Sequence, residues 1–365
     1  MNILHCISSP HIGGIERLVI ELAIAQKAAG MEVSIMLDSF EGQYYDYLLL
    51  QDISLFESGI KGGFDWNPNT YRSLKHTFNR FDIVHLHNFS ALRSKAAIDS
   101  NARVVHTMHG LSKGIRKENK IKYVIRESLK KHFLNKVDVF IANSRHTLNL
   151  AKAHYGLKNI STKVVLNGIR IMDKALNPNN TNTTKFTIGL VSRFTHRKRI
   201  DRLIKAFYLF LKKGGNGHCI LVGDGAAYDA VKTQIKSLEL ESNITLAGYS
   251  NDVDKYYKQF DVLVHPSDNE GFGLIAVEAY FHGLPVLVFK DSGGLVEVVE
   301  PLEPENIVHT EMELANRLLF YAKHKTKFAE NAIKRINYAK ANFGIERMER
   351  EYYEIYKGLL LGSER

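Results

Sequence analysis

The chain has 365 residues, of which 45% are hydrophobic and 24% charged, the composition of an ordinary globular protein with a sizeable core. Its 49 Lys and Arg residues against 39 Asp and Glu residues give a net charge of +10, which favours anionic substrates, lipids or nucleic acid as partners. The sequence contains no zinc-finger spacing, basic leucine zipper or short repeats of aromatic and basic residues, so we expect no nucleic-acid partner.

The N-terminal residues and the cysteines favour a cytoplasmic protein. The run from Met1 to Ile7 is too short and too soon interrupted for a signal peptide, and no stretch reaches the roughly 18 apolar residues of a membrane span. Cys6 and Cys219 lie far apart in apolar runs. We interpret them as reduced core thiols rather than as a disulfide or a metal site.

Predicted strands and helices alternate along the whole chain. In the first half, the apolar pattern predicts a helix over 14–29, which Gly30 ends, and strands over 2–8, 32–37, 82–86, 103–107 and 138–142. In the second half, it predicts helices over 204–212 and 228–237 and strands over 186–191, 219–222, 244–246, 262–264 and 285–288. Continuous apolar strands between helices favour parallel sheets covered on both faces. The predicted fold class is therefore α/β, with two doubly wound, Rossmann-like domains.

A polar linker separates the two halves. Residues 173–185 are rich in turn formers, so we expect a first domain over 1–172 and a second domain over 186–343. Residues 344–365 carry a helical pattern, and we expect this helix to pack back on the first domain. Two doubly wound domains joined in this way are expected to face each other across a cleft, and ligands of such sheets bind beyond the carboxyl ends of the strands.

Residues 113–136 combine many Lys and Arg residues with apolar residues at near-helical spacing, among them Ile121, Val124, Ile125 and Phe133. A basic amphipathic helix of this kind often lies on an anionic membrane surface, where each basic residue contributes about 1 kcal/mol. The same pattern also fits the solvated face of an ordinary domain helix. The sequence leaves both interpretations open.

Two carboxylates, Glu270 and Glu278, bracket a glycine-containing turn and the start of a predicted helix. Gly271 and Gly273 let backbone amides approach a ligand closely, and a helix N-terminus there favours an anionic or polyhydroxylated ligand. A sugar nucleotide has both properties. We therefore expect the two carboxylates to face one crevice.

Two further sets of residues suit a phosphate. Gly13 and Gly14 follow the first predicted strand, although such a pair is more often an ordinary turn, and no further glycine completes the GxGxxG pattern of a nicotinamide or flavin site. Arg193 and Lys198 lie in a basic loop after the first strand of the second domain, and a planar fork with a point charge suits a diphosphate. A solvated basic loop would look the same, but the position after a strand favours function.

His109 comes just after the strand predicted over 103–107, at its carboxyl end. A lone histidine is more often structural than catalytic, and this chain has 16 histidines. The position at the edge where ligands of such sheets bind makes His109 a candidate catalytic residue.

These residues form part of an ordered set of motifs. The set comprises Gly13-Gly14, His109, Asn143-Ser144, Asn167-Gly168, Arg193 with Lys198, Gly223-Asp224-Gly225, Pro266-Ser267, and Glu270 with Glu278 around Gly271-Phe272-Gly273. In this order they resemble glycosyltransferase family 4, the retaining nucleotide-sugar transferases with the two-domain GT-B fold. The resemblance covers nearly the whole chain.

The resemblance implies how the second domain would hold the donor. Glu278 would bind the ribose hydroxyls of the nucleotide. Glu270, together with the backbone amides of Phe272, Gly273 and Leu274, would bind the donor sugar. Glu270 would then act in catalysis as a positioning and electrostatic group rather than as an established nucleophile.

The resemblance also implies how the diphosphate would be held. Arg193 and Lys198 would clamp it, Gly13 and Gly14 would approach it from the first domain, and His109 would lie beside the donor sugar on the acceptor side. No metal and no cofactor is expected, because the basic pair and the helix N-termini would neutralise the phosphate charge.

Three positions depart from the usual pattern of the family. Arg199 and Ser192 stand where glycine is common, and Arg170 stands where an acidic residue is common. Arg199 adds charge near the expected phosphate position and should not abolish binding.

We therefore expect a cytoplasmic, retaining glycosyltransferase that moves a sugar from a UDP-linked donor to a hydroxyl of a growing glycan. The basic helix and the high isoelectric point suggest a lipid-linked acceptor and peripheral membrane contact, as in lipopolysaccharide (O-antigen) or capsule assembly. Two alternatives remain: a nucleotide-sugar epimerase, against which the Glu270 and Glu278 motif counts, and a non-catalytic nucleotide-sugar-binding protein, against which the complete charged set counts.

Overall fold

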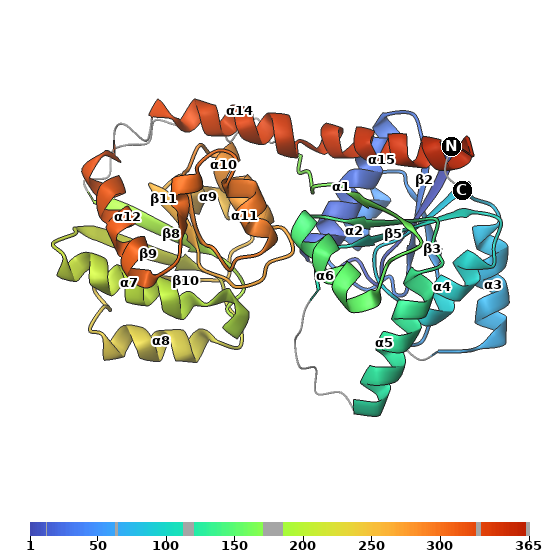
Figure 1. Ribbon diagram of the computed structural model, residues 1–365, viewed down its shortest axis with the longest axis horizontal. Coiled ribbons are helices and arrows are strands. Elements are labelled where there is room, and N and C mark those ends of the chain that lie inside the picture. The colour runs from blue at the N-terminus through green and yellow to red at the C-terminus, as the bar shows by residue number, and fades with distance from the viewer. Residues whose placement is uncertain (12, 63–64, 112–119, 171–184, 326–329, 363–365) are drawn as a thin grey trace. The chain divides into compact units, whose positions relative to one another are not determined.

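The computed structural model describes residues 1–365 apart from 12, 63–64, 112–119, 171–184, 326–329 and 363–365. The chain divides into two compact units, Met1–Arg170 with Ile345–Arg365 and Ile171–Gly344, each built around one sheet (Figure 1). Apart from Lys185, the predicted linker over 173–185 lies outside the described residues. Among the described helices, none is long and apolar enough to cross a bilayer.

The first unit contains a seven-stranded sheet in the order β3-β2-β1-β4-β5-β6-β7, and its paired strands run parallel. The strands are β1 (Asn2–Cys6), β2 (Glu32–Leu37), β3 (Ser54–Glu57), β4 (Ile83–Leu86), β5 (Arg103–Met108), β6 (Val139–Ala142) and β7 (Ser161–Val164). The helices are α1 (Gly14–Ala28), α2 (Tyr45–Leu49), α3 (Pro68–Phe78), α4 (Ala91–Ile98), α5 (Lys120–Leu134), α6 (Arg145–Tyr155) and α15 (Ile345–Leu360).

Side chains alternate between the two faces of this sheet and fill a core on each. Ile3 of β1 packs in the cluster that includes residues of α1 and α15, whereas the next residue, Leu4, packs in the cluster that includes residues of α3 and α4. The period of two along a strand produces this alternation. Both faces of the sheet are therefore covered, which explains why its central strands are almost entirely buried.

The C-terminal helix α15 lies beside α1 in the first unit (Figure 1). Met348, Tyr352 and Tyr356 are buried in the core of that unit. The hydroxyl of Tyr356 lies 2.6 Å from Nδ1 of His85 on β4, and the hydroxyl of Tyr352 lies 3.2 Å from Oγ1 of Thr107 on β5. Apolar packing and hydrogen bonds to two sheet strands thus make the last helix part of the first unit.

The second unit contains a six-stranded parallel sheet in the order β10-β9-β8-β11-β12-β13. The strands are β8 (Phe186–Val191), β9 (Gly217–Val222), β10 (Ile244–Gly248), β11 (Val262–His265), β12 (Val286–Phe289) and β13 (Ile307–Val308). The helices are η2 (His196–Lys198), α7 (Ile200–Lys212), α8 (Tyr228–Ser237), α9 (Asp254–Tyr257), α10 (Leu274–Phe281), α11 (Gly294–Val299), η3 (Pro304–Asn306), α12 (Glu311–Lys323) and α14 (Ala332–Phe343).

The sequence of helix α7 has the apolar spacing of a helix that packs against a sheet. Ile200, Leu203, Ile204 and Phe207 recur at helical spacing and are all buried in the core of the second unit.

The two parallel sheets with helices between their strands confirm the predicted α/β fold class. In each sheet the carboxyl ends of all strands meet at one edge, where the predicted site residues of that unit are found.

Candidate active site

The loop that follows β11 carries Glu270 and is fastened to the loop that follows β12. The backbone N–H of Glu270 donates to the carbonyl oxygen of Ser292 at 3.1 Å, and the N–H of Gly294 donates to the carbonyl oxygen of Glu270 at 2.8 Å. The hydroxyl of Ser292 also donates to the carbonyl oxygen of Ser267 at 2.7 Å. These bonds fix the backbone position of Glu270, so its side chain extends from a rigid loop.

The carboxylate of Glu270 pairs with Lys198. Nζ of Lys198 lies 2.7 Å from Oε1 of Glu270, and Nε2 of His265 lies 3.7 Å from the same oxygen. Burial alone would raise the pKa of Glu270, but His265 and Lys198 outweigh it and hold the pKa well below its usual range. Burial lowers the pKa of His265. At neutral pH the pair is therefore an ionised carboxylate and an ammonium group beside a neutral imidazole.

Gly273 starts helix α10 in a conformation that suits only glycine. Its φ is +100°, and a Cβ at this position would lie 2.3 Å from Cδ1 of Leu295. The neighbouring Phe272 is buried and packs edge-on against Phe343 at a centroid distance of 5.8 Å, whereas Leu274 is half-buried. The Phe272 side chain is thus a structural anchor, and the close packing of Gly273 fixes the start of α10.

Glu278 lies further along α10 and is half-buried. The hydroxyl of Tyr257 on α9 donates to its Oε2 at 2.9 Å. Tyr257 is itself buried and stacks on His282 at a centroid distance of 4.8 Å. The tyrosine therefore orients the carboxylate to which the family resemblance gives the ribose. The sequence did not predict this contact.

Arg193 lies on an exposed loop after β8, and this loop is fastened to the turn after β9. The N–H of Phe194 donates to the carbonyl oxygen of Asp224 at 2.8 Å. Gly223 has a φ of +137°, and a Cβ there would lie 1.8 Å from the carbonyl oxygen of Ser192. The Gly223-Asp224-Gly225 motif therefore supports the arginine loop, while the Arg193 side chain remains exposed.

Two of the three residues that depart from the family pattern, Arg199 and Arg170, form ion pairs. Arg199, where glycine is common in the family pattern, has a φ of +46° and pairs with Asp201 at 3.0 Å. The left-handed backbone explains why glycine suits this position. Arg170 pairs with Glu21 of α1 at 3.1 Å, so its charge is balanced within the first unit.

In the first unit, His109 directly follows β5 and is held on two sides. Its Nε2 lies 3.1 Å from Nδ1 of His87, and its carbonyl oxygen accepts from Nδ2 of Asn143 at 2.9 Å. Burial lowers the pKa of His109 to about 4. At neutral pH the imidazole is therefore uncharged, so it can donate and accept hydrogen bonds but cannot act as a fixed cation.

Gly13 caps helix α1 with an extended backbone, and Gly14 is the first residue of that helix. A Cβ at Gly13 would meet only the carboxylate end of the Glu16 side chain, which can move. The protein's own packing therefore gives no strong reason for glycine at this position. Close approach of a ligand to the backbone, as the sequence suggested, stays a prediction.

The predicted site residues fall into two groups, one in each unit. The first unit holds Gly13, Gly14 and His109 at the carboxyl edge of its sheet. The second unit holds Arg193, Lys198, Phe272, Gly273, Leu274, Glu270 and Glu278. Within that unit the structure joins Lys198 directly to Glu270 and places Arg193 on the same connection between β8 and α7 as Lys198.

Comparison with known proteins identifies the family. A model described as "Glycosyltransferase Family 4" matches residues 12–171, and a model described as "Glycosyl transferases group 1" matches residues 172–338. The chain belongs to the family 4 glycosyltransferases. The boundary between the two matched regions falls next to Arg170, the last residue of the first part of the first unit.

Three relatives illustrate the relationship of this glycosyltransferase to known proteins. A poly(ribitol-phosphate) alpha-N-acetylglucosaminyltransferase of Staphylococcus aureus is 24% identical over 73% of this chain and 50% of its own length. An uncharacterized 41.2 kDa protein in the cps region of Klebsiella pneumoniae is 27% identical over 77% of this chain and 80% of its own length. The crystal structure of Anabaena HepE in complex with UDP has a TM-score of 0.78 at 23% identity and covers 98% of this chain and 100% of its own.

The length matched varies among the relatives. The chain spans 33%, 27% and 50% of the lengths of the first three curated relatives that it matches. The structural match to HepE shows the GT-B fold. A further relative, a capsular polysaccharide biosynthesis glycosyltransferase of Staphylococcus aureus, is 29% identical over 31% of this chain and 30% of its own length.

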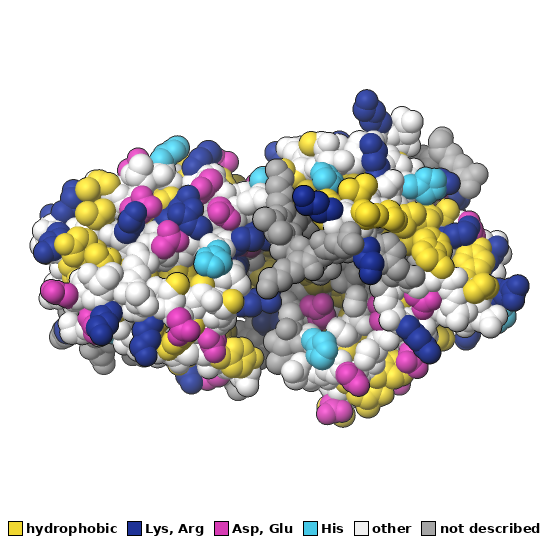
Figure 2. Space-filling model, turned by 90° about the horizontal axis from the view of Figure 1, so that it is seen from below, with side chains coloured by type: hydrophobic (Ala, Val, Ile, Leu, Met, Phe, Trp, Pro, Cys, Tyr) yellow, Lys and Arg dark blue, Asp and Glu magenta, His cyan; other side chains and the backbone are white. Residues whose placement is uncertain are grey.

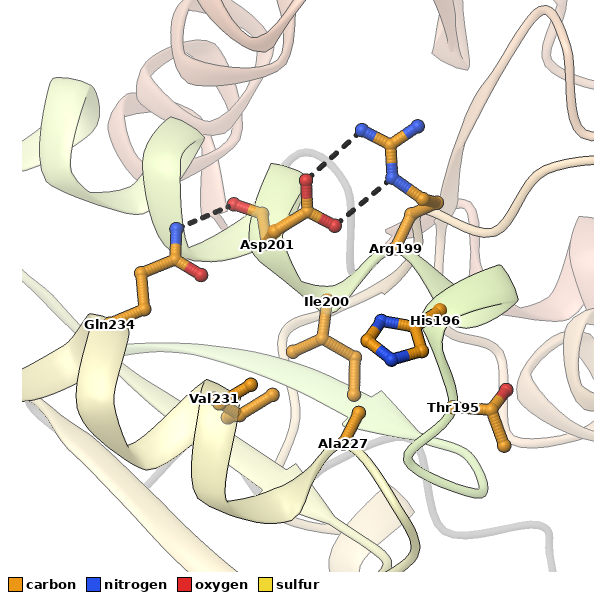
Figure 3. A pocket seen from close by; sticks show the side chains of 9 residues that line it. Thr195, His196, Arg199, Ile200, Asp201, Ala227, Val231 and Gln234 are labelled. Atoms are coloured by element: carbon orange, nitrogen blue, oxygen red, sulfur yellow. Dashed lines mark hydrogen bonds and ion pairs between the residues drawn. The ribbon is translucent and has the colours of Figure 1, made fainter.

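A pocket in the second unit lies between the start of α7 and the helix α8 (Figure 3). It has a volume of about 330 Å³ and is lined by Thr195, His196, Arg199, Ile200, Asp201, Ala227, Ala230, Val231 and Gln234. None of the predicted donor-binding residues lines it. Arg199 is paired with Asp201, whose carbonyl oxygen accepts from Nε2 of Gln234 at 3.2 Å, so the cation in this pocket is already balanced.

Within the described part of the chain, one group of side chains has the spacing of metal ligands. Ring nitrogens of His5, His85 and His87 lie within 4.8 Å of one another in the core of the first unit. Each of their six ring nitrogens already has a hydrogen-bond partner. A metal ion would have to replace several of these bonds. The expectation that this glycosyltransferase needs no metal stays a prediction.

Proposed function

We propose that this glycosyltransferase is a retaining enzyme that moves a sugar from a UDP-sugar to a hydroxyl of a growing, lipid-linked glycan of a surface polysaccharide. The observation that supports it most is the ion pair between Lys198 and Glu270 on a rigid loop, at the edge of the sheet that also carries Arg193. This pair combines a cation for a diphosphate with a carboxylate for sugar hydroxyls. The HepE structure in complex with UDP and the cps-region and poly(ribitol-phosphate) relatives support the choice of donor and pathway.

Transfer breaks the bond between the anomeric carbon and the diphosphate oxygen, and the electron pair passes to the β-phosphate. Lys198 and Arg193 would stabilise this new charge directly, because both are cations preorganised on loops that the protein holds in place. The acceptor hydroxyl would attack the anomeric carbon from the face that the diphosphate leaves, and this retains the anomeric configuration. Its proton would pass to the departing phosphate oxygen. Glu270, ionised at neutral pH, would accept hydrogen bonds from donor-sugar hydroxyls.

Glu278 would bind the ribose hydroxyls of the nucleotide. A carboxylate has two oxygens that both accept hydrogen bonds, so it suits two neighbouring hydroxyls, and the bond from Tyr257 to Oε2 fixes its orientation. Because α10 begins at a tightly packed glycine, its start is fixed relative to the loop that carries Glu270, and so is the place of Glu278 on the helix. The spacing of the two carboxylates would then match the spacing of sugar and ribose in the donor.

Helix α5 supports contact with an anionic membrane. Of its apolar residues, Ile121, Val124 and Ile125 are 68%, 65% and 46% exposed, whereas Phe133 at the other end is buried. The same helix carries the basic residues Lys120, Lys122, Arg126, Lys130 and Lys131. Figure 2, seen from the side to which the start of α5 projects, shows hydrophobic and basic side chains next to each other on this part of the first unit. Exposed apolar residues beside cations suit the boundary between headgroups and acyl chains.

The test is a donor screen followed by a stereochemical assay. Nucleotide sugars that differ in base and sugar are added to the protein, and thermal stabilisation identifies the donor, because a ligand bound only to the folded state raises apparent stability. The donor is then incubated with a lipid-linked acceptor panel, and the anomeric configuration of the product is read by NMR. Retention supports the proposal, and inversion overturns it. An epimerised free donor indicates an epimerase, and binding without turnover across the panel indicates a non-catalytic binding protein.

A further inference from the structure

A row of four hydrogen-bonded side chains crosses the first unit and ends at His109. Nε2 of His5 lies 2.7 Å from Oε1 of Gln26, Nδ1 of His5 lies 2.9 Å from Nε2 of His87, and Nδ1 of His87 lies 3.1 Å from Nε2 of His109. The residues come from four places: α1, β1 and the loops that follow β4 and β5. Gln26 and His5 are fully buried, and His87 is 5% exposed.

The direction of donation along the row is set at Gln26, because the atom that contacts His5 is the amide oxygen, which can only accept. The Oε1 atom of Gln26 has no proton, so Nε2–H of His5 must donate to it. Burial lowers the pKa of His5 to about 4 and that of His87 well below its usual range, so both rings are neutral and carry one proton each. Nδ1 of His5 is then unprotonated and accepts from Nε2–H of His87.

His109 is the last member of the row. The one proton of His87 is on Nε2, so its Nδ1 is unprotonated and accepts from Nε2–H of His109. His109 is also neutral at pH 7, which leaves its Nδ1 without a proton. This Nδ1 atom is buried and has no hydrogen-bond partner among the described residues. A buried acceptor without a partner is costly, which points to a donor group that arrives with a ligand.

We propose that Gln26, His5 and His87 are positioning residues that hold His109 with its proton on Nε2, so that its Nδ1 accepts a hydrogen bond from a hydroxyl of the sugar substrate. The identity of the ligand as a sugar rests on the proposed function. The tautomer itself does not, because it follows from hydrogen bonds within the protein. A histidine with the proton on Nδ1 would present a donor at the same place, so a hydroxyl could only accept from it.

A second set of hydrogen bonds, centred on His85, supports the His87 ring. The hydroxyl of Tyr356 and Oγ1 of Thr107 lie 2.6 Å and 2.7 Å from the two ring nitrogens of His85, and the His85 ring packs on His87 with a centroid distance of 3.9 Å. The C-terminal helix α15 therefore supports the His87 ring through His85. Since every ring nitrogen of His5, His85 and His87 is already used, a hydrogen-bonded row explains this cluster better than a metal site does.

The direct test is nitrogen-15 NMR of the full-length, ligand-free protein labelled at histidine. His109→Asn identifies the His109 signals by their loss. We expect Nδ1 of His109 to give the signal of an unprotonated nitrogen and Nε2 that of a protonated one. A protonated Nδ1, or a mixture of both tautomers, overturns the proposal. This readout needs no substrate, so it stands or falls separately from the proposed function.

Three variants test whether the row sets the tautomer. Gln26→Met keeps the shape but removes the accepting oxygen, and we expect a mixture of tautomers at His109 and a fall in kcat/KM of about tenfold, the equivalent of one lost hydrogen bond. Gln26→Glu keeps an oxygen acceptor and should retain the wild-type tautomer. His106→Phe is the matched control, since His106 is a buried histidine of β5 outside the row that stacks on Phe140. An unchanged His109 tautomer in Gln26→Met, or an equal change in His106→Phe, contradicts the proposal.

Discussion

Lys198 and Glu270 form an ion pair of 2.7 Å although 72 positions separate them in the chain. Lys198 follows β8 and Glu270 follows β11, and these two strands are parallel neighbours in the sheet. Parallel neighbours bring their carboxyl ends to the same edge, so the topology of the second unit itself creates the pair. The lysine is thereby held in one position, and the half-buried carboxylate stays ionised.

We expect Lys198→Ala to lower kcat by about 100- to 1000-fold, because a preorganised cation no longer stabilises the charge that develops on the leaving diphosphate. The effect on donor KM should be smaller. Steady-state kinetics with the donor from the screen measure both constants. Lys290→Ala is the matched control. Lys290 also forms an ion pair in the second unit, with Glu300, but both of these side chains are 53% exposed. Unchanged turnover in Lys198→Ala, or an equal loss in Lys290→Ala, would count against the assignment.

Tyr257→Phe tests the orientation of Glu278. Removing the hydroxyl that donates to Oε2 of Glu278 should weaken UDP binding by about 2- to 10-fold, the range of one net hydrogen bond, without changing kcat at saturating donor. Isothermal titration with UDP measures the change. Tyr256→Phe, in the adjacent position of α9, is the control and should bind UDP like the wild type. Equal affinities in all three proteins would show that the tyrosine has no role at the ribose.

The sequence predicted the central strands well because they are buried on both faces. The strands over 32–37 and 186–191 have the predicted bounds. The missed strands β3 and β7 lie at the two edges of the first sheet, where half-exposed positions break the apolar pattern. The missed β13 has two residues and leaves no pattern to detect.

The site was only partly predictable for a different reason. The motif residues around Glu270 could be named from their order in the chain, but their partners could not. His265, Tyr257 and Gln26 are single polar residues in otherwise apolar or ordinary segments, and only the packed structure brings them to Glu270, Glu278 and His5. Hydrogen bonds between residues that are distant in sequence leave no local signal.

Gly273→Ala should destabilise the protein by about 2–4 kcal/mol, since a side chain would be strained at a φ of +100° and would also collide with Leu295. Gly214→Ala separates the two causes. Gly214 has a φ of +83° but no heavy atom within 4 Å of a Cβ, so only the backbone strain of about 1 kcal/mol applies. Urea unfolding measures both values. A Gly273→Ala variant no less stable than Gly214→Ala would contradict the close packing of the α10 start.

The buried histidines of the first unit predict a loss of stability in mild acid. Burial lowers the pKa of His106 from 6.5 to about 3 and that of His109 to about 4. The unfolded chain takes up these protons below pH 6.5 while the folded chain does not, so stability is complete above pH 6.5 and falls as the pH drops towards 4.

His106→Phe tests this linkage. Removing one such group should flatten the pH dependence of the unfolding free energy between pH 6 and 4 by up to about 1.4 kcal/mol per pH unit. His76→Phe removes an exposed histidine of the same unit and serves as the control. The measurement is urea unfolding at several pH values. The same slope in His106→Phe as in the wild type would show that this histidine is not held neutral by the fold.

Val124→Asp tests membrane contact by helix α5. Val124 is 65% exposed among basic residues, so a negative charge there both removes apolar surface and repels anionic headgroups. We expect binding to vesicles of phosphatidylglycerol and phosphatidylcholine to fall by about tenfold or more in a flotation assay at low salt, because burying one valine side chain contributes about 1.5–3 kcal/mol. Leu50→Asp makes the same change at another exposed apolar residue of the first unit, 81% exposed, and should bind like the wild type. A wild-type protein that does not float with these vesicles, or two variants that lose binding equally, would leave α5 with no role at a membrane and would favour the solvated face that the sequence also allows.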